Sequence, residues 1–155
     1  MGSQSDWPIM KSASEMLDNF GVEHEVRVIS AHRAPDTLAE YCETARDRGL
    51  KVLIAGAGLA AALPGATAAK TPLPVLGVPL EANAMGGLDA MLSMVQMPPG
   101  IPVGTLAVGK PGAKNAAILA VSILALADDR LRDALDDFRA RQTAQVVSLP
   151  DPREA

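Results

Sequence analysis

The chain has 155 residues, of which 48% are hydrophobic, 21% charged and 3% aromatic, with a formal net charge of -4. This length and apolar content suit one globular domain, residues 1–155, with a sizeable core. The negative charge and scarce aromatic rings argue against a nucleic-acid surface, which needs a basic stripe and stacking platforms. A small-molecule partner fits this composition better.

The cysteine content and the first residues indicate a cytoplasmic protein without a membrane anchor. Cys42 is the single cysteine, so an internal disulfide is excluded. It falls with Leu38, Tyr41 and Ala45 on one helical face, which predicts a buried core thiol. The N-terminus has no apolar signal segment, and Asp6 stands where a myristoylation pattern needs Ser or Thr.

Apolar, β-rich runs alternate with helical patterns along the chain. The predicted strands are 22–29, 51–55, 74–78 and 103–108, and the predicted helices are 8–20, 36–48, 59–70, 87–96 and 113–127. Gly21 and Gly49 stand where helix C-caps are expected, and each is followed at once by a strand. This order predicts an α/β fold with a doubly wound parallel sheet.

The first polar loop, residues 2–6, should follow a strand, yet only Met1 precedes it. We therefore expect a sheet whose first strand is missing, which leaves an unpaired apolar edge. A start codon placed too late and an absent partner strand are the two explanations.

The unusual residues gather in the loops that follow the predicted strands. These loops are residues 30–35, 56–58, 79–87 and 109–112. Open α/β sheets bind ligands at the carboxyl ends of their strands, so we expect the functional site at this edge.

The first two polar loops each pass into a helix that begins with a proline. Ser3, Ser5 and Asp6 lie where free backbone N–H groups and the positive end of a helix favour an anion. Arg33 adds a side chain that can hold a phosphate with two hydrogen bonds. Together these loops predict a phosphate pocket that contains one histidine, His32.

Two helices toward the C-terminus favour assembly. The segment 113–127 is apolar on nearly all sides, and at about fifteen residues it is shorter than the roughly 20 that span a bilayer. A single domain of this size has little interior to hide such a helix completely, so we expect a homo-oligomer. Residues 128–147 form a predicted amphipathic helix, with Leu131, Leu135 and Phe138 packed on a neighbour.

A dinucleotide-binding fold is an alternative. Residues 56–61 follow a predicted strand and match G-x-G-x-x-A, with Glu81 after the next strand as a candidate ribose-binding acid. However, Pro64 and Gly65 interrupt the helix that should carry the pyrophosphate. A lone motif of this kind in an Ala- and Gly-rich chain is a weak signal.

The two histidines differ in their surroundings. His24 lies within strand residues and is interpreted as structural. His32 lies among the polar loops, where the structural alternative is a hydrogen bond to Asp36. Histidine is the side chain whose unperturbed pKa lies nearest neutral pH, which suits it to general acid/base chemistry.

Taken together, nine motifs resemble the class I N5-carboxyaminoimidazole ribonucleotide mutases. In order they are GSQSDW (2–7), SAHRAP (30–35), AGAG (55–58), LPG (63–65), LGVP (76–79), GLD (87–89), SMVQMP (93–98), GIPVGT (100–105) and NAA (115–117). The resemblance implies a flavodoxin-like three-layer α/β/α sandwich, usually an octamer. It also implies an isomerase of purine (IMP) biosynthesis that moves a carboxylate from N5 to C4 of an aminoimidazole ribonucleotide, without metal, nucleotide or flavin.

The resemblance also assigns site residues. His32 matches the general acid/base, which would serve decarboxylation and recarboxylation. Arg33 matches the arginine that binds the phosphate. The implied substrate-binding set is Ser3, Ser5, Asp6, Ser30, Arg33 and Gly58.

At two positions the sequence departs from this family's pattern. Leu59 stands where the pattern has glycine, and Ala62 stands where it has a second histidine. If position 59 has a positive φ, leucine there costs on the order of 1 kcal/mol in strain. These residues predict low turnover and leave two alternatives: a non-catalytic oligomer that binds a phosphorylated ribonucleotide, and a direct aminoimidazole ribonucleotide carboxylase that uses carbon dioxide.

Overall fold

The structure is a computed structural model that describes residues 1–154. Its sheet has three parallel strands in the order β1-β2-β3, with bounds β1 Leu53–Gly58, β2 Val75–Leu80 and β3 Gly104–Thr105. β1 and β2 pair along their whole length, from Leu53 opposite Val75 to Gly58 opposite Leu80. The carboxyl ends of these strands therefore meet at one edge.

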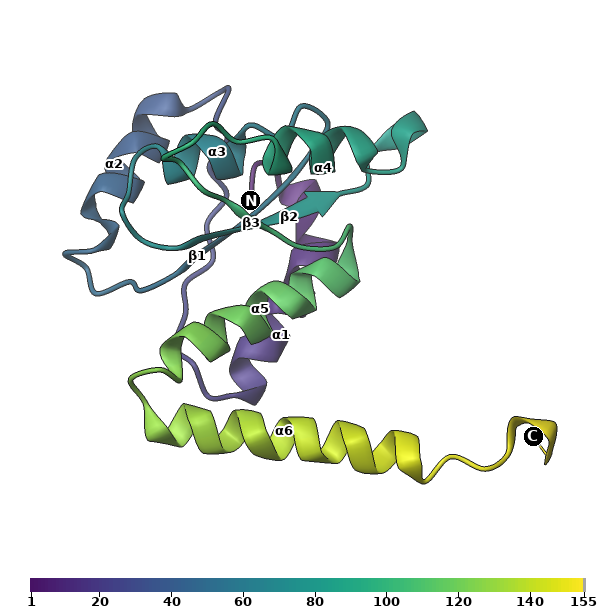
Figure 1. Cartoon of the computed structure of the whole chain (residues 1–155). Helices are drawn as coiled ribbons and strands as arrows, with labels where there is room; N and C mark the ends of the chain where they lie inside the picture. Colours follow the sequence, from purple (N-terminus) through teal and green to yellow (C-terminus); the bar gives the residue numbers. More distant parts are fainter. Residues whose placement is uncertain (155) are drawn as a thin grey trace.

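The helices form a layer on each side of this sheet (Figure 1). The α-helices are α1 Trp7–Asn19, α2 Pro35–Ala45, α3 Leu63–Ala68, α4 Leu88–Val95, α5 Lys110–Leu124 and α6 Asp129–Val147; the 3-10 turns are η1 Gln4–Asp6, η2 Asn83–Met85 and η3 Pro152–Glu154. In Figure 1, α2, α3 and α4 lie on one side of the strands, and α1 and α5 lie on the other. This arrangement confirms the predicted three-layer α/β/α class.

The local sequence signals set the turns between these elements. Pro8 and Pro35 each lie in the first turn of a helix, where a missing N–H group costs nothing. Gly21 and Gly49 have φ of +64° and +91°, the left-handed conformation expected at helix ends. β2 is buried at every position, because helices cover both of its faces. The prediction for Cys42 is confirmed, since its side chain is only 1% exposed.

The strand predicted at 22–29 is not formed. The backbone there is extended, but it lies outside the sheet, because the neighbouring position has no strand to pair with. The main-chain partner of its last residues is Met1: the Met1 amino group donates to the Arg27 carbonyl oxygen at 3.0 Å, and the Ile29 N–H donates to the Met1 carbonyl oxygen at 2.9 Å. The apolar periodicity of residues 22–29 fits a strand, but it does not show whether a neighbouring strand is present to pair with them.

Most other elements begin or end within one to three residues of the prediction, and two elements differ more. The strand expected at 103–108 shortens to β3, because its pairing with β2 covers only Leu76 and Gly77. The helix expected at 59–70 begins only at Leu63, after residues with positive φ that no helix accepts.

The C-terminal helices are only partly covered. α5 packs against α1 and the sheet through its small residues. Leu119 on α5 is 39% exposed, and Leu126, just beyond the end of this helix, is 87% exposed. α6 contacts its own chain through the buried Leu131 and the edge-on contact of Phe138 with Phe20, at 5.3 Å between ring centroids. Within residues 1–154, none of the helices combines the length and apolar content needed to cross a bilayer.

Candidate active site

The first loop forms a closed hydrogen-bonded turn at the start of η1 and α1. The Ser3 Oγ accepts from the Ser5 N–H at 3.2 Å and from the Ser5 hydroxyl at 2.8 Å. In return, the Ser3 N–H donates to the Asp6 Oδ2 at 2.9 Å, which completes a capping box. The three predicted residues are thus fixed relative to one another before any ligand arrives.

Arg33 joins this first loop to the second. Its Nη2 donates to the Gly2 carbonyl oxygen at 2.9 Å, and its Nε donates to the Ser30 Oγ at 3.1 Å. A guanidinium has five N–H donors, so three stay available for an anion among the contacts of residues 1–154. The structure therefore brings Ser3, Ser5, Asp6, Ser30 and Arg33 together, as the sequence predicts.

His32 lies exposed in the turn that Arg33 anchors. The Ala34 N–H donates to the Ser30 carbonyl oxygen at 2.9 Å and closes this turn. The neighbouring Ala31 packs against the apolar cluster that includes Ala57 and Ala61, which places the turn beside the end of β1. The structural alternative for His32, a hydrogen bond to Asp36, does not occur among the hydrogen bonds of the described chain.

The loop after β1 is backbone-strained. Leu59 has φ +56° and Ala61 has φ +30°, the left-handed region that side chains with a Cβ rarely adopt. The condition considered for position 59, a positive φ, therefore holds, whereas the positive φ of Ala61 was not predicted. Leu59 is 53% exposed, and Ala62 places no polar side chain ahead of α3. Each left-handed residue costs on the order of 1 kcal/mol.

Gly58 ends β1 where the chain has little room for a side chain. A Cβ there would lie 3.1 Å from the Ala82 Cβ and 3.2 Å from the Leu80 carbonyl oxygen. Gly58 shares the carboxyl edge of the sheet with the first two loops, but no described hydrogen bond links it to them.

Sequence reasoning missed Asp89 in the first turn of α4. Its Oδ1 is buried and has no hydrogen-bond partner among the described residues, an arrangement that costs free energy. Gly87 precedes α4 with φ +84° and lies against the backbone of Glu81 at the end of β2. Asp89 therefore belongs to the same edge, and its place in the GLD motif was the available signal.

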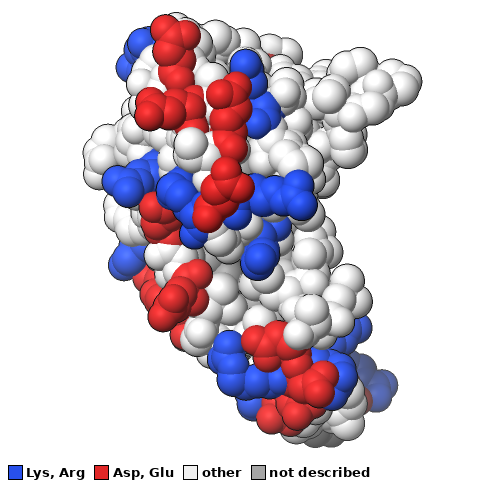
Figure 2. All heavy atoms as spheres, turned by 90° about the vertical axis from the view of Figure 1, so that its left-hand side faces the viewer, with Lys and Arg blue, Asp and Glu red and all other residues white. Residues whose placement is uncertain are grey.

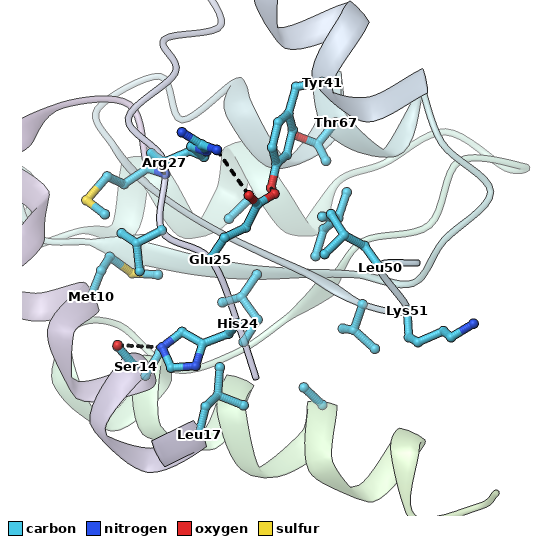
Figure 3. Close-up of a pocket in the computed structure, with 18 of the residues that line it drawn as sticks. Met10, Ser14, Leu17, His24, Glu25, Arg27, Tyr41, Leu50, Lys51 and Thr67 are labelled. Carbon is cyan, nitrogen blue, oxygen red and sulfur yellow. Dashed lines mark hydrogen bonds and ion pairs between the residues drawn. The ribbon is translucent and has the colours of Figure 1, made fainter. Parts of the chain in front are cut away.

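The side of the molecule that carries α2 holds charged side chains of both signs. Figure 2, which views the molecule from this side, shows acidic and basic groups next to one another. A cavity of about 250 Å³ that opens to the surface lies between residues 22–29 and β1 (Figure 3), and its lining does not include His32 or Arg33.

Comparison with known proteins decides the family. A family model described as AIR carboxylase matches residues 1–145. The chain belongs to the AIR carboxylase family. Its predicted resemblance is thereby confirmed.

Individual members of the family are similar in sequence to this chain over nearly its whole length. N5-carboxyaminoimidazole ribonucleotide mutase of Vibrio vulnificus is 58% identical over 154 residues, covering 99% of this chain and 96% of its own. The proteins of that name from Pseudomonas aeruginosa and Escherichia coli K12 are 56% and 55% identical, covering 100% of this chain and 95% and 92% of their own.

A solved structure shares the fold. The crystal structure of Treponema denticola PurE superposes with a TM-score of 0.86 at 26% identity, covering 95% of this chain and 90% of that one. Both the family membership and the late start of α3 at Leu63 count against the dinucleotide-binding alternative.

Proposed function

We propose that this chain is an isomerase of purine (IMP) biosynthesis that moves a carboxylate from N5 to C4 of carboxyaminoimidazole ribonucleotide. The observation that carries the proposal is the identity of 55–58%, over nearly the whole chain, with proteins named N5-carboxyaminoimidazole ribonucleotide mutase. The joined loops at the carboxyl edge of the sheet supply a place for the substrate.

Substrate binding begins with the phosphate. The remaining donors of the Arg33 guanidinium and the hydroxyls of Ser3 and Ser5 lie in the first two loops, where a phosphate would gain charge-assisted hydrogen bonds. Because Arg33 is already held by Gly2 and Ser30, little side-chain entropy is lost when the phosphate binds.

His32 carries the proton in the chemical steps. The protonated imidazole gives its proton to N5 as the N5–carboxylate bond breaks, which releases carbon dioxide and leaves aminoimidazole ribonucleotide. C4 then attacks the carbon dioxide, and the neutral imidazole removes the C4 proton, which restores the ring electrons and the protonated histidine. The carboxylate has moved, and the net proton count is unchanged.

A second function is favoured by the strained loop. Leu59 and Ala62 place a leucine and a methyl group where the family pattern has glycine and histidine. A chain that keeps the Arg33 clamp but lacks the second imidazole can bind a phosphorylated ribonucleotide while turning it over slowly. Direct carboxylation of aminoimidazole ribonucleotide needs the same pocket and is the nearer alternative.

Assembly into a homo-oligomer, expected to be an octamer, fits the uncovered apolar side chains. The exposed large apolar residues of the C-terminal third are Leu119, Leu126, Val146, Val147 and Leu149. Such side chains gain free energy when a second subunit covers them. We place this oligomer in the cytoplasm, in keeping with its proposed pathway.

The test compares substrates. Absorbance is followed with N5-carboxyaminoimidazole ribonucleotide, and separately with aminoimidazole ribonucleotide plus bicarbonate, while calorimetry measures binding of aminoimidazole ribonucleotide. Turnover of the first substrate alone supports the mutase, and turnover only with bicarbonate supports the direct carboxylase. Binding without turnover supports the second function, and neither binding nor turnover contradicts all three.

A further inference from the structure

The Asp89 carboxylate has a buried oxygen without a hydrogen-bond donor. Its Oδ1 accepts a hydrogen bond from none of the described residues. The described ion pairs do not include Asp89 either. Such an oxygen costs free energy, because the hydrogen bonds that it makes to water in the unfolded chain are not replaced in the fold. Packing within the described chain therefore does not explain why a carboxylate stands at this position.

The place of Asp89 in α4 offsets only part of this cost. Asp89 is the second residue of α4, where the helix macrodipole favours a negative charge. Asp36 has the same place in α2, but it is exposed. An exposed aspartate gains the same contribution from the dipole and keeps its hydrogen bonds to water. The buried Oδ1 is thus what distinguishes Asp89, and Asp36 offers a matched comparison.

α4 carries Asp89 to the carboxyl edge of the sheet. A Cβ added to Gly77 would lie 3.1 Å from the Met94 Sδ, so Met94 packs on the middle of β2. α4 connects the parallel strands β2 and β3 and runs back along them (Figure 1), so its first residues lie nearest the carboxyl ends. Asp89 precedes Met94 by a helical rise of about 7.5 Å, which equals about two residues of a strand. Asp89 is therefore level with Pro79, near the end of β2.

One apolar cluster borders both Asp89 and the candidate site. Ala90, which follows Asp89, is fully buried in this cluster together with Ala57 of β1. Ala31, which precedes His32, packs against the same cluster. The first turn of α4, the end of β1 and the turn of His32 therefore surround one part of the carboxyl edge.

Among residues 1–154, the Thr105 Oγ1 is the other buried side-chain oxygen without a partner. Thr105 lies opposite Gly77, in the middle of β2 and below the edge. A neutral hydroxyl also costs less to bury than a charged group. Asp89 is thus the residue whose unpaired oxygen lies at the edge where sheets of this class bind their ligands.

We propose that Asp89 is a specificity-determining residue, whose Oδ1 accepts a hydrogen bond from the exocyclic N5–H of the aminoimidazole ring. This inference rests on the proposed function, which brings that ring to the carboxyl edge with its phosphate at Arg33. N5 keeps at least one hydrogen in the N5-carboxylated substrate, in the aminoimidazole intermediate and in the C4-carboxylated product. One acceptor can therefore hold N5 while the carboxylate moves from N5 to C4.

An unpaired buried acceptor also discriminates between ligands. A ligand with an N–H at this position supplies the donor that the protein lacks. A ligand with a hydrogen atom in place of the amine leaves the carboxylate oxygen unpaired and loses affinity for that reason. Asp89 thus selects imidazoles that carry an amino group.

The experiment compares two ribonucleotides that differ only in this amine. Calorimetry measures the binding of aminoimidazole ribonucleotide, and of imidazole ribonucleotide with hydrogen in place of the amine, to the unaltered chain. We expect the first ligand to bind at least about tenfold more tightly. In Asp89→Ala the two affinities should differ by less than about threefold, because the acceptor is gone. Asp89→Asn keeps an acceptor oxygen and should retain part of the discrimination.

Asp36→Ala is the matched control, and it should keep the ratio of the two affinities. Denaturant unfolding of the free proteins adds a measurement that involves no ligand. Asp36→Ala loses only the contribution of the helix dipole, whereas Asp89→Ala loses this contribution and also removes the unpaired oxygen. Asp89→Ala should therefore unfold at the higher denaturant concentration. A carboxylate that stabilises the fold would give the opposite order.

Three results would overturn the inference and leave the proposed function intact. These are equal affinity of the unaltered chain for the two ribonucleotides, an equal loss of affinity for both in Asp89→Ala, and a lower stability of Asp89→Ala than of Asp36→Ala. If neither ribonucleotide binds the unaltered chain, the proposed function itself is contradicted, and this inference with it.

Discussion

The Arg33 guanidinium donates to the Gly2 carbonyl oxygen at 2.9 Å, so one side chain ties together two loops that lie 31 positions apart in the sequence. This bond fixes the relative position of the two loops that we propose as the phosphate subsite. It also makes the arginine the first target for substitution.

Arg33→Ala should weaken binding of aminoimidazole ribonucleotide by about 1.5 to 3 kcal/mol, or roughly 10- to 150-fold, because a charge-assisted contact to phosphate is lost. Calorimetry measures this change. Arg46→Ala removes an exposed arginine at the end of α2 and should leave affinity unaltered. Equal affinities for the Arg33 variant and the unaltered chain would remove Arg33 from the site.

His32→Asn should keep much of the ligand affinity and abolish carboxylate transfer, since asparagine retains polarity but cannot exchange the proton near neutral pH. Affinity and turnover are measured on the same preparation. His24→Asn is the comparison, because His24 is held by Ser14 away from the candidate site. Residual turnover above a hundredth of the original, about 2.7 kcal/mol of barrier, would show that another group moves the proton.

Leu59→Gly combined with Ala62→His should raise turnover by at least about tenfold, which corresponds to about 1.4 kcal/mol of barrier. The glycine relieves the strain of φ +56° and clears space beside the substrate, and the imidazole restores a polar group. Ala61→Gly relieves strain without changing either family position, so it should raise stability but not rate. Unchanged turnover in the double variant would mean that both residues are dispensable.

Glu25→Gln should destabilise the fold at neutral pH by less than about 1 kcal/mol, because the ion pair is partly exposed. The hydrogen bond from Arg48, with a further one from Tyr41, lowers the pKa of Glu25 below its ordinary value. A lowered folded-state pKa stabilises the protein above the ordinary carboxyl pKa, and this stabilisation is lost as the pH falls through the lowered value.

Denaturant unfolding at several pH values measures this effect. The difference between the Glu25 variant and the unaltered chain should shrink in acid. Glu23→Gln, at an exposed position of the same segment, should show no such dependence. A difference for Glu25→Gln that persists unchanged at acid pH would exclude the ion pair as its cause.

Local signals predicted most of the fold. Glycines at positions 21 and 49 and prolines at 8 and 35 marked helix ends correctly, because they act through the chain's own φ angles. The strand at 22–29 failed, since a strand exists only with a neighbour and periodicity cannot report one.

Some features of the candidate site were predicted from the sequence, and others became visible only in the structure. The motifs predicted the first two loops, and the structure joins them through Arg33. Asp89 was missed because an unpartnered carboxylate oxygen becomes visible only when α4 is packed against the sheet. The positive φ of Ala61 was missed because alanine has no preference for the left-handed region that a sequence pattern could reveal.

Transfer of a labelled carboxylate tests the central claim most directly. The unaltered chain is incubated with N5-carboxyaminoimidazole ribonucleotide that carries carbon-13 in its carboxylate, and carbon-13 NMR follows the label. We predict that the label appears in the C4 carboxylate faster than in buffer alone, and that His32→Asn abolishes the gain. Release of the label only as carbon dioxide or bicarbonate, at the rate seen in buffer, would contradict the mutase function.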